Sequence, residues 1–136
     1  MLRRRRPSRR QKASVQYVDT GPDEPTKWVV QGRFGGACAR CGRPGATIQH
    51  RKPRRMGGTR DPAINRPSNL IWVCGTGTTG CHGHMESYRH EAYGAGWLLH
   101  DGEDPLLEPV LLWDRRRVVL DDEGGYGLAP KEEETQ

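Results

Sequence analysis

The chain has 136 residues, of which only 33% are hydrophobic, so it fits a single domain whose small core needs help from a metal, disulfides or a partner. Its apolar runs are too short for a membrane span, and its basic N-terminus lacks the apolar stretch of a secretion signal, so we expect a cytoplasmic protein with no membrane partner. Residues 1–60 hold 16 lysines and arginines against 3 acidic residues, a balance of +13, whereas residues 61–136 hold 6 against 14, a balance of −8. Such a split points to a polyanion, most often nucleic acid, although a basic tail that only aids solubility has the same composition.

The N-terminal segment is expected to be a basic arm. Residues 1–14 contain six arginines and one lysine but no acidic residue, so they cannot bury apolar surface. We therefore expect residues 1–14 to be disordered until they meet phosphate groups, as part of a disordered basic arm over residues 1–27. The sequence KWVV at residues 27–30, with three apolar residues, predicts a short strand at the start of a compact domain over residues 28–100.

Four cysteines, in two pairs, form the clearest metal-binding pattern in the chain. Cys38 and Cys41 are separated by two residues, as in tight turns that direct two thiolates at one ion. Cys74 and Cys81 form a looser pair across a loop of glycine and threonine. Because no secretion signal places the chain in an oxidising compartment, disulfides are disfavoured. The pattern predicts a structural Zn²⁺ whose binding energy supports folding, and the alternative is two unrelated pairs of free thiols.

Between and after the cysteine pairs, the sequence predicts a strand, a long loop, a second strand and a helix. Residues 47–50 and 70–73 have the composition of short strands. Residues 51–69 are rich in arginine, glycine and proline, and loops of this length in compact domains are usually functional or mobile. Residues 82–93 predict a helix that ends at Gly94.

The C-terminal part, residues 101–136, is expected to form a hairpin and an acidic tail. Residues 97–99 predict one more strand before it, and apolar runs at residues 110–113 and 118–120 flank a charged turn, which is typical of a β-hairpin. Residues 121–136 are acidic and rich in glycine, so we expect a flexible end. The element order predicts an α+β protein with a small core stapled by the cysteine site.

Three polar residues fall at the junctions of this core: His50 ends the first strand, Asn69 begins the second and His82 opens the helix. Hydrolysis of a phosphodiester needs a base that takes a proton from water and a cation that stabilises charge on the phosphate. A histidine suits the role of base when an acceptor holds its other ring nitrogen, and an Asn side chain can supply that contact or fix the loop that does. A second histidine can bind a divalent ion together with Glu86, which lies one helical turn beyond His82.

Each of these residues also has a structural interpretation. Asn69 can simply cap a turn, Glu86 can be a surface carboxylate, and His82 can be a ligand of the cysteine site. His50 alone can be a hydrogen-bonded histidine without a catalytic role.

Taken together, these motifs resemble the HNH endonucleases, particularly those of tailed bacteriophages. The resemblance covers roughly residues 38–97 and rests on QHRKPRRMGG at 49–58, PSNL at 67–70 and CGTGTTGCHG at 74–83. It implies a ββα-metal fold with one catalytic divalent ion, His50 as general base, Asn69 in support and a structural zinc at the four cysteines. It also implies cleavage of DNA to 5′-phosphate and 3′-hydroxyl ends, in phage DNA processing or packaging in the host cytoplasm, with terminase as a candidate partner.

Two positions depart from the pattern common in this family. Gln49 stands where many members have a metal-binding Asp or His, and Glu86 stands where a second helix His is frequent. Oxygen ligands favour Mg²⁺ or Mn²⁺ over Ni²⁺ or Zn²⁺ at the catalytic site. Because Gln49 is a poor ligand, a zinc-stapled nucleic-acid-binding module without catalysis stays open as the alternative. Five basic residues on the loop after His50 are expected to contact DNA phosphates: Arg51, Lys52, Arg54, Arg55 and Arg60.

Overall fold

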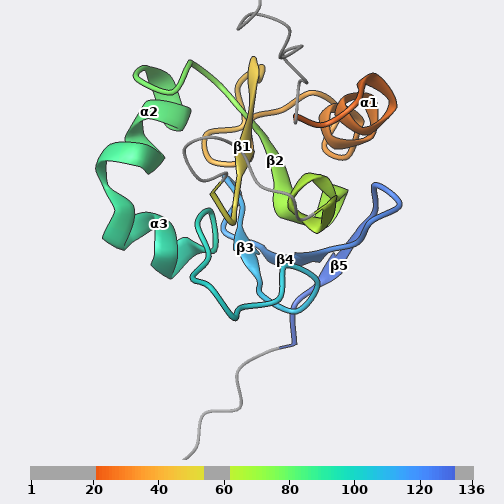
Figure 1. Cartoon of the computed structure of the whole chain (residues 1–136). Coiled ribbons are helices and arrows are strands. Elements are labelled where there is room, and N and C mark those ends of the chain that lie inside the picture. The colour runs from red at the N-terminus through yellow and green to blue at the C-terminus, as the bar shows by residue number, and fades with distance from the viewer. Residues whose placement is uncertain (1–20, 54–61, 131–136) are drawn as a thin grey trace, which may run out of the picture.

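The computed structural model describes residues 21–53 and 62–130. This part of the chain is a mixture of three α-helices and two small antiparallel sheets, which confirms the α+β class (Figure 1). Most of the expected N-terminal arm, the last six residues and three of the proposed phosphate-binding arginines, Arg54, Arg55 and Arg60, lie outside the described residues. None of the described helices combines the length and the hydrophobicity that a membrane span requires.

Helix α1 (Glu24–Gly32) replaces the strand expected at residues 27–30, so that prediction is wrong. The helix begins at Asp23, whose Oδ1 accepts a 2.9 Å hydrogen bond from the backbone N–H of Thr26, and Pro25 occupies the first turn, where its missing N–H costs nothing. Val30 is its only buried residue, and Trp28 is 70% exposed. Residues 27–30 therefore belong to a helix and not to a strand.

The first sheet is a pair of strands with the predicted bounds. Strand β1 (Thr47–His50) pairs antiparallel with β2 (Leu70–Val73), and His50 lies opposite Leu70. Between them, the described part of the long loop contains two short 3-10 helices, η2 (Pro62–Asn65) and η3 (Pro67–Asn69). In Figure 1 this pair lies at the centre of the view, with α1 on one side and the other two helices on the opposite side.

The helix expected at residues 82–93 is in fact two helices, α2 (Gly80–Ser87) and α3 (Arg89–Ala95). The break occurs at Tyr88, whose φ and ψ of −111° and 64° are not helical. Gly96 ends α3 with a φ of 76°, and a Cβ at this position would collide with the carbonyl of Pro109. Residues 97–99, expected as a strand, form a bend whose apolar side chains are buried.

The C-terminal hairpin is confirmed and belongs to a larger sheet. Strands β3 (Val110–Leu111) and β4 (Arg117–Leu120) pair antiparallel, and β5 (Tyr126–Leu128), which was not expected, adds to the other edge of β4. The hydrophobic core crosses the domain boundary expected at residue 100, because residues of this sheet share one buried cluster with β2, α2 and the cysteines. The described residues of the C-terminal part are therefore integral to the fold.

Arg51 is a structural residue, and its expected contact with DNA phosphate is wrong. Its side chain is fully buried and donates hydrogen bonds of 2.7–2.9 Å to the carbonyls of Gly96, Ser68, Pro105 and Glu108. Burial lowers the pKa of Arg51 to about 10, which still leaves the guanidinium charged near neutral pH. Because the side chain is buried and its donors are engaged by backbone carbonyls, Arg51 does not reach a phosphate in solvent.

Replacing Arg51 by Met is expected to lower the free energy of unfolding by more than about 3 kcal/mol, because several buried carbonyls lose their donor at once. Urea denaturation followed by circular dichroism measures this change. The control is Arg43→Met at an exposed arginine, which should stay within about 0.5 kcal/mol of the parent. Equal stability of the two variants would contradict the role given to Arg51.

Candidate functional site

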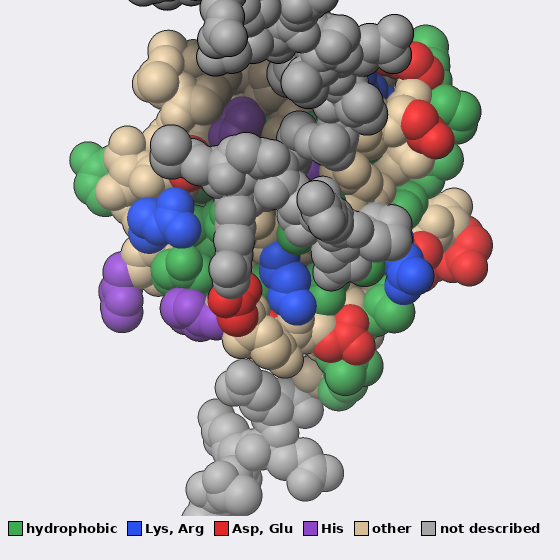
Figure 2. All heavy atoms as spheres, in the orientation of Figure 1, with side chains coloured by type: hydrophobic (Ala, Val, Ile, Leu, Met, Phe, Trp, Pro, Cys, Tyr) green, Lys and Arg blue, Asp and Glu red, His purple; other side chains and the backbone are tan. Residues whose placement is uncertain are grey.

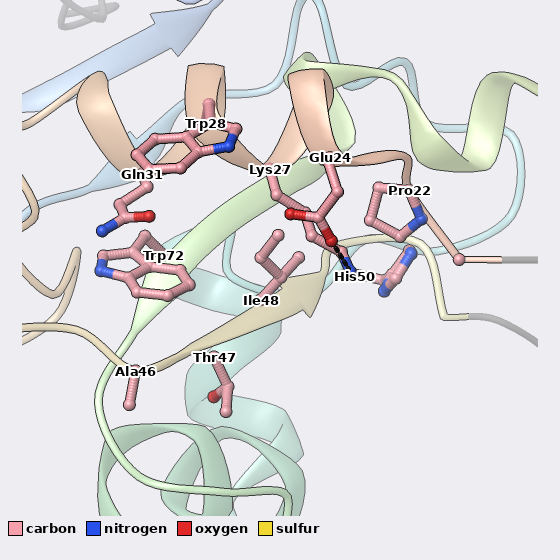
Figure 3. Close-up of a pocket in the computed structure, with 11 residues that line it drawn as sticks. Pro22, Glu24, Lys27, Trp28, Gln31, Ala46, Thr47, Ile48, His50 and Trp72 are labelled. Carbon is pink, nitrogen blue, oxygen red and sulfur yellow. Dashed lines mark hydrogen bonds and ion pairs between the residues drawn. The ribbon is translucent and has the colours of Figure 1, made fainter.

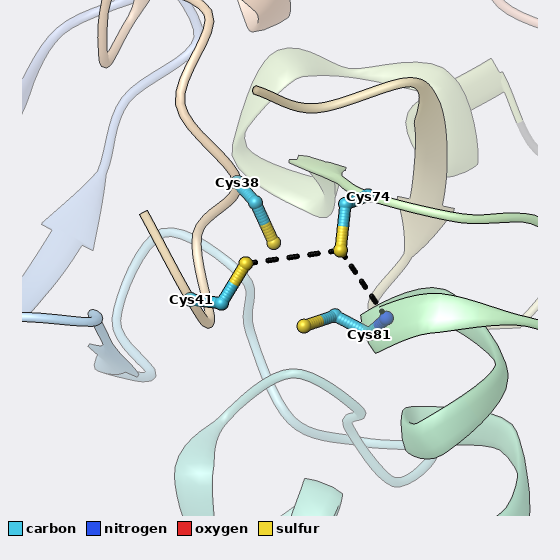
Figure 4. A group of neighbouring side chains, drawn as sticks. All are labelled: Cys38, Cys41, Cys74 and Cys81. Carbon is cyan, nitrogen blue, oxygen red and sulfur yellow. Dashed lines mark hydrogen bonds between the residues drawn. The ribbon is translucent and has the colours of Figure 1, made fainter. Parts of the chain in front are cut away.

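The four cysteines converge on one point (Figure 4). The Sγ atoms of Cys38, Cys41, Cys74 and Cys81 all lie within 4.8 Å of one another, and the structure contains no disulfide between them. The Sγ atoms of Cys41 and Cys74 are 3.7 Å apart. Four sulfurs around Zn²⁺, each at about 2.3 Å, are separated by about 3.8 Å in a tetrahedron. The cluster can therefore hold a structural metal ion such as zinc.

Local backbone geometry explains why the cysteines meet. In the first pair, the N–H of Cys38 bonds to the carbonyl of Arg43 at 2.6 Å, and Gly42, at a φ of 76°, closes the turn. In the second pair, Cys74 follows β2 and Cys81 lies in the first turn of α2. The backbone N–H of Cys81 donates to the Sγ of Cys74 at 3.4 Å, as expected for a sulfur that carries negative charge.

The electrostatics of the cluster fit a bound cation. Burial raises the pKa of Cys81 to about 12 and also raises the pKa of Cys41, whereas the N–H of Cys81 lowers that of Cys74. Arg40 donates from Nη1 to the Sγ of Cys81 at 3.3 Å, and so partly offsets the charge of four thiolates. Thiols with raised pKa values ionise when a metal takes the place of their protons, which couples metal binding to folding.

A chain of hydrogen bonds fixes the protonation of His82. Thr47 on β1 donates its only hydroxyl hydrogen to the carbonyl of Gly75 at 2.9 Å, and the same oxygen lies 2.7 Å from Nδ1 of His82. A hydroxyl that has used its hydrogen can only accept, so Nδ1 of His82 carries a proton and Nε2 of the neutral ring does not. Burial lowers the pKa of His82, against the opposing charge of Glu86, and this favours the neutral ring. Nε2 of His82 is thus the nitrogen that can bind a metal.

His50 is oriented by Asn65, a residue that no pattern in the sequence indicates. Its Nε2 lies 2.9 Å from Oδ1 of Asn65, the last residue of η2. Because an amide oxygen only accepts, this contact places the proton of a neutral His50 ring on Nε2 and leaves Nδ1 as the basic nitrogen. Asn65 had no signal in the sequence, since it lies in a polar loop without periodicity and far from His50 along the chain.

Asn69 holds the backbone on both sides of this contact. It is 1% exposed, its Oδ1 accepts from the N–H of Lys52 at 2.8 Å, and its Nδ2 donates to the carbonyls of Lys52 and Ile64 at 3.2 and 2.8 Å. Lys52 follows His50 by two residues, and Ile64 precedes Asn65. Asn69 therefore positions both partners of the His50–Asn65 pair without touching either ring.

Strand β1 separates the two histidines. In Figure 3, Thr47 points toward α2, whereas Ile48 and His50 point toward α1. Since Thr47 contacts His82, the side chains of His50 and His82 approach opposite faces of the strand. Among residues 21–53 and 62–130, the four cysteines are the only group of three or more metal-binding side chains close enough to share an ion.

The remaining proposed residues are distributed differently. Glu86 forms an exposed ion pair of 3.2 Å with Arg89, and Gln49 is buried, with its Nε2 donating to the carbonyl of His50. Lys52 is half-buried.

Half of the basic residues, 11 of 22, lie outside the described part of the chain. Figure 2 shows acidic and basic side chains interspersed on the visible face. The basic first half and the acidic second half of the sequence therefore do not appear on that face as separate patches of positive and negative charge.

Comparisons with protein-family models, curated proteins and solved structures find no match to this chain. Its chemistry therefore has to follow from its own side chains. Two features stand out: a four-sulfur group that can hold a metal, and two histidines whose ring nitrogens are fixed by neighbouring residues.

Purified protein is expected to carry one Zn²⁺ per chain, as measured by elemental mass spectrometry against protein concentration. Cys74→Ser removes one sulfur and should lower the zinc content, whereas His82→Ala keeps all four sulfurs and should retain it. Zinc loss in the His82 variant, or full zinc content in the Cys74 variant, would contradict a site made of four cysteines.

Proposed function

We propose that this protein is a metal-dependent endonuclease that hydrolyses DNA through a ββα-metal core of the HNH type, formed by β1, β2 and α2. The observation that carries the proposal is the fixed tautomer of His82, whose Nδ1 donates to Thr47 and whose Nε2 is left to bind a cation. Ligand histidines in metalloproteins are commonly held in this way by a hydrogen bond to the second ring nitrogen.

His50 acts as the general base. Its Nε2–H is held by Asn65, so Nδ1 takes a proton from the attacking water, and the charged ring that results stays hydrogen-bonded to the amide oxygen. Asn69 keeps the two residues in place through Lys52 and Ile64. It acts as a positioning residue, because its side chain is buried and contacts only backbone.

His82 and Glu86 hold the catalytic ion. Glu86 lies one turn beyond His82 on α2, and its charge already acts on the pKa of His82. Its ion pair with Arg89 is exposed, and such pairs stabilise a protein by less than about 1 kcal/mol, so the carboxylate can exchange partners. Two protein ligands suit Mg²⁺ or Mn²⁺, which keep several positions for water and phosphate oxygens. When bound, the ion stabilises charge on the phosphate and on the leaving oxygen.

The edge of β1 explains how residues on opposite faces can serve one phosphate. The first sheet has two strands, so the outer edge of β1 has no neighbouring strand among the described residues. A DNA strand that lies along this edge meets His50 from the side of α1 and His82 from the side of α2. The cysteine site, as a structural zinc, holds α2 against the end of β2 in this arrangement.

The cellular setting is proposed from the sequence resemblance alone. It comprises DNA processing or packaging for a tailed phage in the host cytoplasm, with terminase as the partner. The phosphate contacts are assigned to Lys52 and to the loop arginines Arg54, Arg55 and Arg60.

A second candidate function is a nucleic-acid-binding module stapled by zinc and without catalysis. One observation favours it: the described residues contain no group of three or more metal ligands apart from the cysteines. The buried Gln49 agrees with this view, since its amide is engaged with the backbone of His50. The two candidates differ in a single measurable property, which is cleavage.

The protein is expected to nick supercoiled plasmid in the presence of Mg²⁺ or Mn²⁺, and His50→Ala should abolish nicking because no other group takes the proton from water. Gel electrophoresis across a panel of divalent ions measures the rate, and a filter-binding assay checks that the variant still binds DNA. His90→Ala, at an exposed histidine outside the site, is the matched control and should cleave normally. Absence of cleavage with every metal would favour the binding module, and full activity of His50→Ala would refute the proposed base.

Replacing Thr47 by Val is expected to lower the nicking rate by about 10- to 100-fold at limiting metal, because His82 loses the acceptor that fixes its tautomer. The defect should shrink as the Mg²⁺ concentration rises. Thr78→Val, which removes a hydroxyl from the exposed loop between Cys74 and Cys81, serves as control. A metal dependence identical to that of the parent protein would show that Thr47 plays no part in metal binding.

A further inference from the structure

A groove of about 460 Å³ runs between α1 and the β1–β2 pair and ends at His50 (Figure 3). Trp28, Gln31 and Trp72 lie at one end of it, and His50 lies at the other, near Glu24 and Pro22. Its volume is within the range of about 300–1,000 Å³ typical of sites for small ligands. The proposed chemistry at His50 leaves this groove without a role.

The indole rings of Trp28 and Trp72 line one end of the groove. Trp28 projects from α1 with 70% of its surface exposed, which is unusual for a large apolar side chain. Trp72 is held in place, because its Nε1 donates to the carbonyl of Gly36 at 3.1 Å and the backbone of Gly45 packs closely against its ring. One rigid and one accessible indole form a surface on which a flat aromatic ligand can stack.

The polar residues of the groove suit a nucleobase and not a phosphate at this end. The amide of Gln31 lies between the two indoles in Figure 3 and can both donate to and accept from the edge of a base. The carboxylate of Glu24 lies at the other end of the groove, near His50, where Lys27 pairs with it at 3.2 Å and offsets its charge. No charged residue of the groove lies between Trp28 and Trp72 in Figure 3. The tryptophan end of the groove is therefore apolar, with Gln31 as its hydrogen-bonding side chain.

The spacing matches one nucleotide. Trp72 lies opposite Ile48 in the register of the two strands, and His50 is two residues farther along β1. Two residues of a strand span about 7 Å. A base stacked at Trp72 therefore has its sugar over Ile48 and an adjoining phosphate near His50.

We propose that this groove binds one unstacked nucleobase of the DNA substrate, so that the enzyme prefers single-stranded or locally unpaired DNA at the cleavage position. The inference rests on the proposed function, because it names the substrate class of the site at His50. A paired base inside a duplex cannot enter the groove, since both of its faces are already stacked. Entry costs least where the base is already unpaired.

Binding measurements without added Mg²⁺ or Mn²⁺ test the groove separately from cleavage. The probes are a short single-stranded oligonucleotide that contains 2-aminopurine and a blunt duplex of the same sequence. Fluorescence anisotropy gives the affinity of each, and quenching of 2-aminopurine reports stacking on an indole. Trp28→Ala is expected to weaken single-strand binding by about 5-fold or more and to relieve the quenching, while duplex binding stays unchanged.

Tyr88→Ala is the matched control, because Tyr88 is an exposed aromatic residue on the junction of α2 and α3, away from the groove. It should bind both probes like the parent protein. Gln31→Ala provides a second groove variant and should weaken binding of the single strand alone. Unchanged single-strand affinity in Trp28→Ala, or an equal loss for single strand and duplex, would overturn the proposal.

The assignment of base binding to the groove and the assignment of DNA cleavage to the protein fail on different results. If plasmid is nicked but Trp28→Ala binds and cuts single strands normally, the groove assignment is refuted and the nuclease assignment stands. If single strands bind through Trp28 but nothing is cleaved, the groove assignment stands and the nuclease assignment fails.

Discussion

The fold depends on a buried cation. The guanidinium of Arg51 bonds to carbonyls of η3, of the end of α3 and of the loop before β3, three segments that no strand pairing connects. Arg33 repeats the arrangement nearby, with hydrogen bonds to the carbonyls of Pro67, Leu70 and Asp121. In a chain with few apolar residues, carbonyl dipoles gathered around two guanidinium groups take over part of the role of a hydrophobic core. Carbonyls of irregular segments, which would otherwise be buried without donors, are satisfied at the same time.

This constraint also determines where His50 points. Side chains alternate along the end of β1, and both neighbours of His50 are buried, Gln49 at 2% and Arg51 at 0% exposure. With both neighbours anchored inside, the His50 side chain has to face the groove beside α1. Asn69 then fixes the chain one step farther on, at Lys52. The orientation of the proposed base is thus a consequence of burial on either side of it, reinforced by a single amide.

The sequence predicted the parts of this site that follow from spacing, and missed those that follow from packing. Cysteine spacing and the apolar runs of β1 and β2 are local signals, and the cysteine cluster and both strands were found where expected. The burial of Arg51 cannot be predicted from the sequence, because an arginine in a basic loop gives no local sign of burial. The run at residues 27–30 predicts a strand as readily as a helix, because three consecutive apolar residues fit either element, and the capping by Asp23 favours the helix. The contact of Asn65 with His50 and the pairing of β5 with β4 depend on residues distant in the sequence, so no local pattern predicts them.

The first turn of α2 joins two roles in consecutive residues, since Cys81 belongs to the sulfur cluster and His82 follows it directly. The geometry of His82 is therefore only as stable as the first turn that the cluster anchors. By mass action, a metal that binds only the folded chain multiplies the ratio of folded to unfolded molecules by one plus the free metal concentration divided by its dissociation constant. A metal ion held by the cysteines would therefore stabilise the stretch of backbone from which the His82 side chain projects.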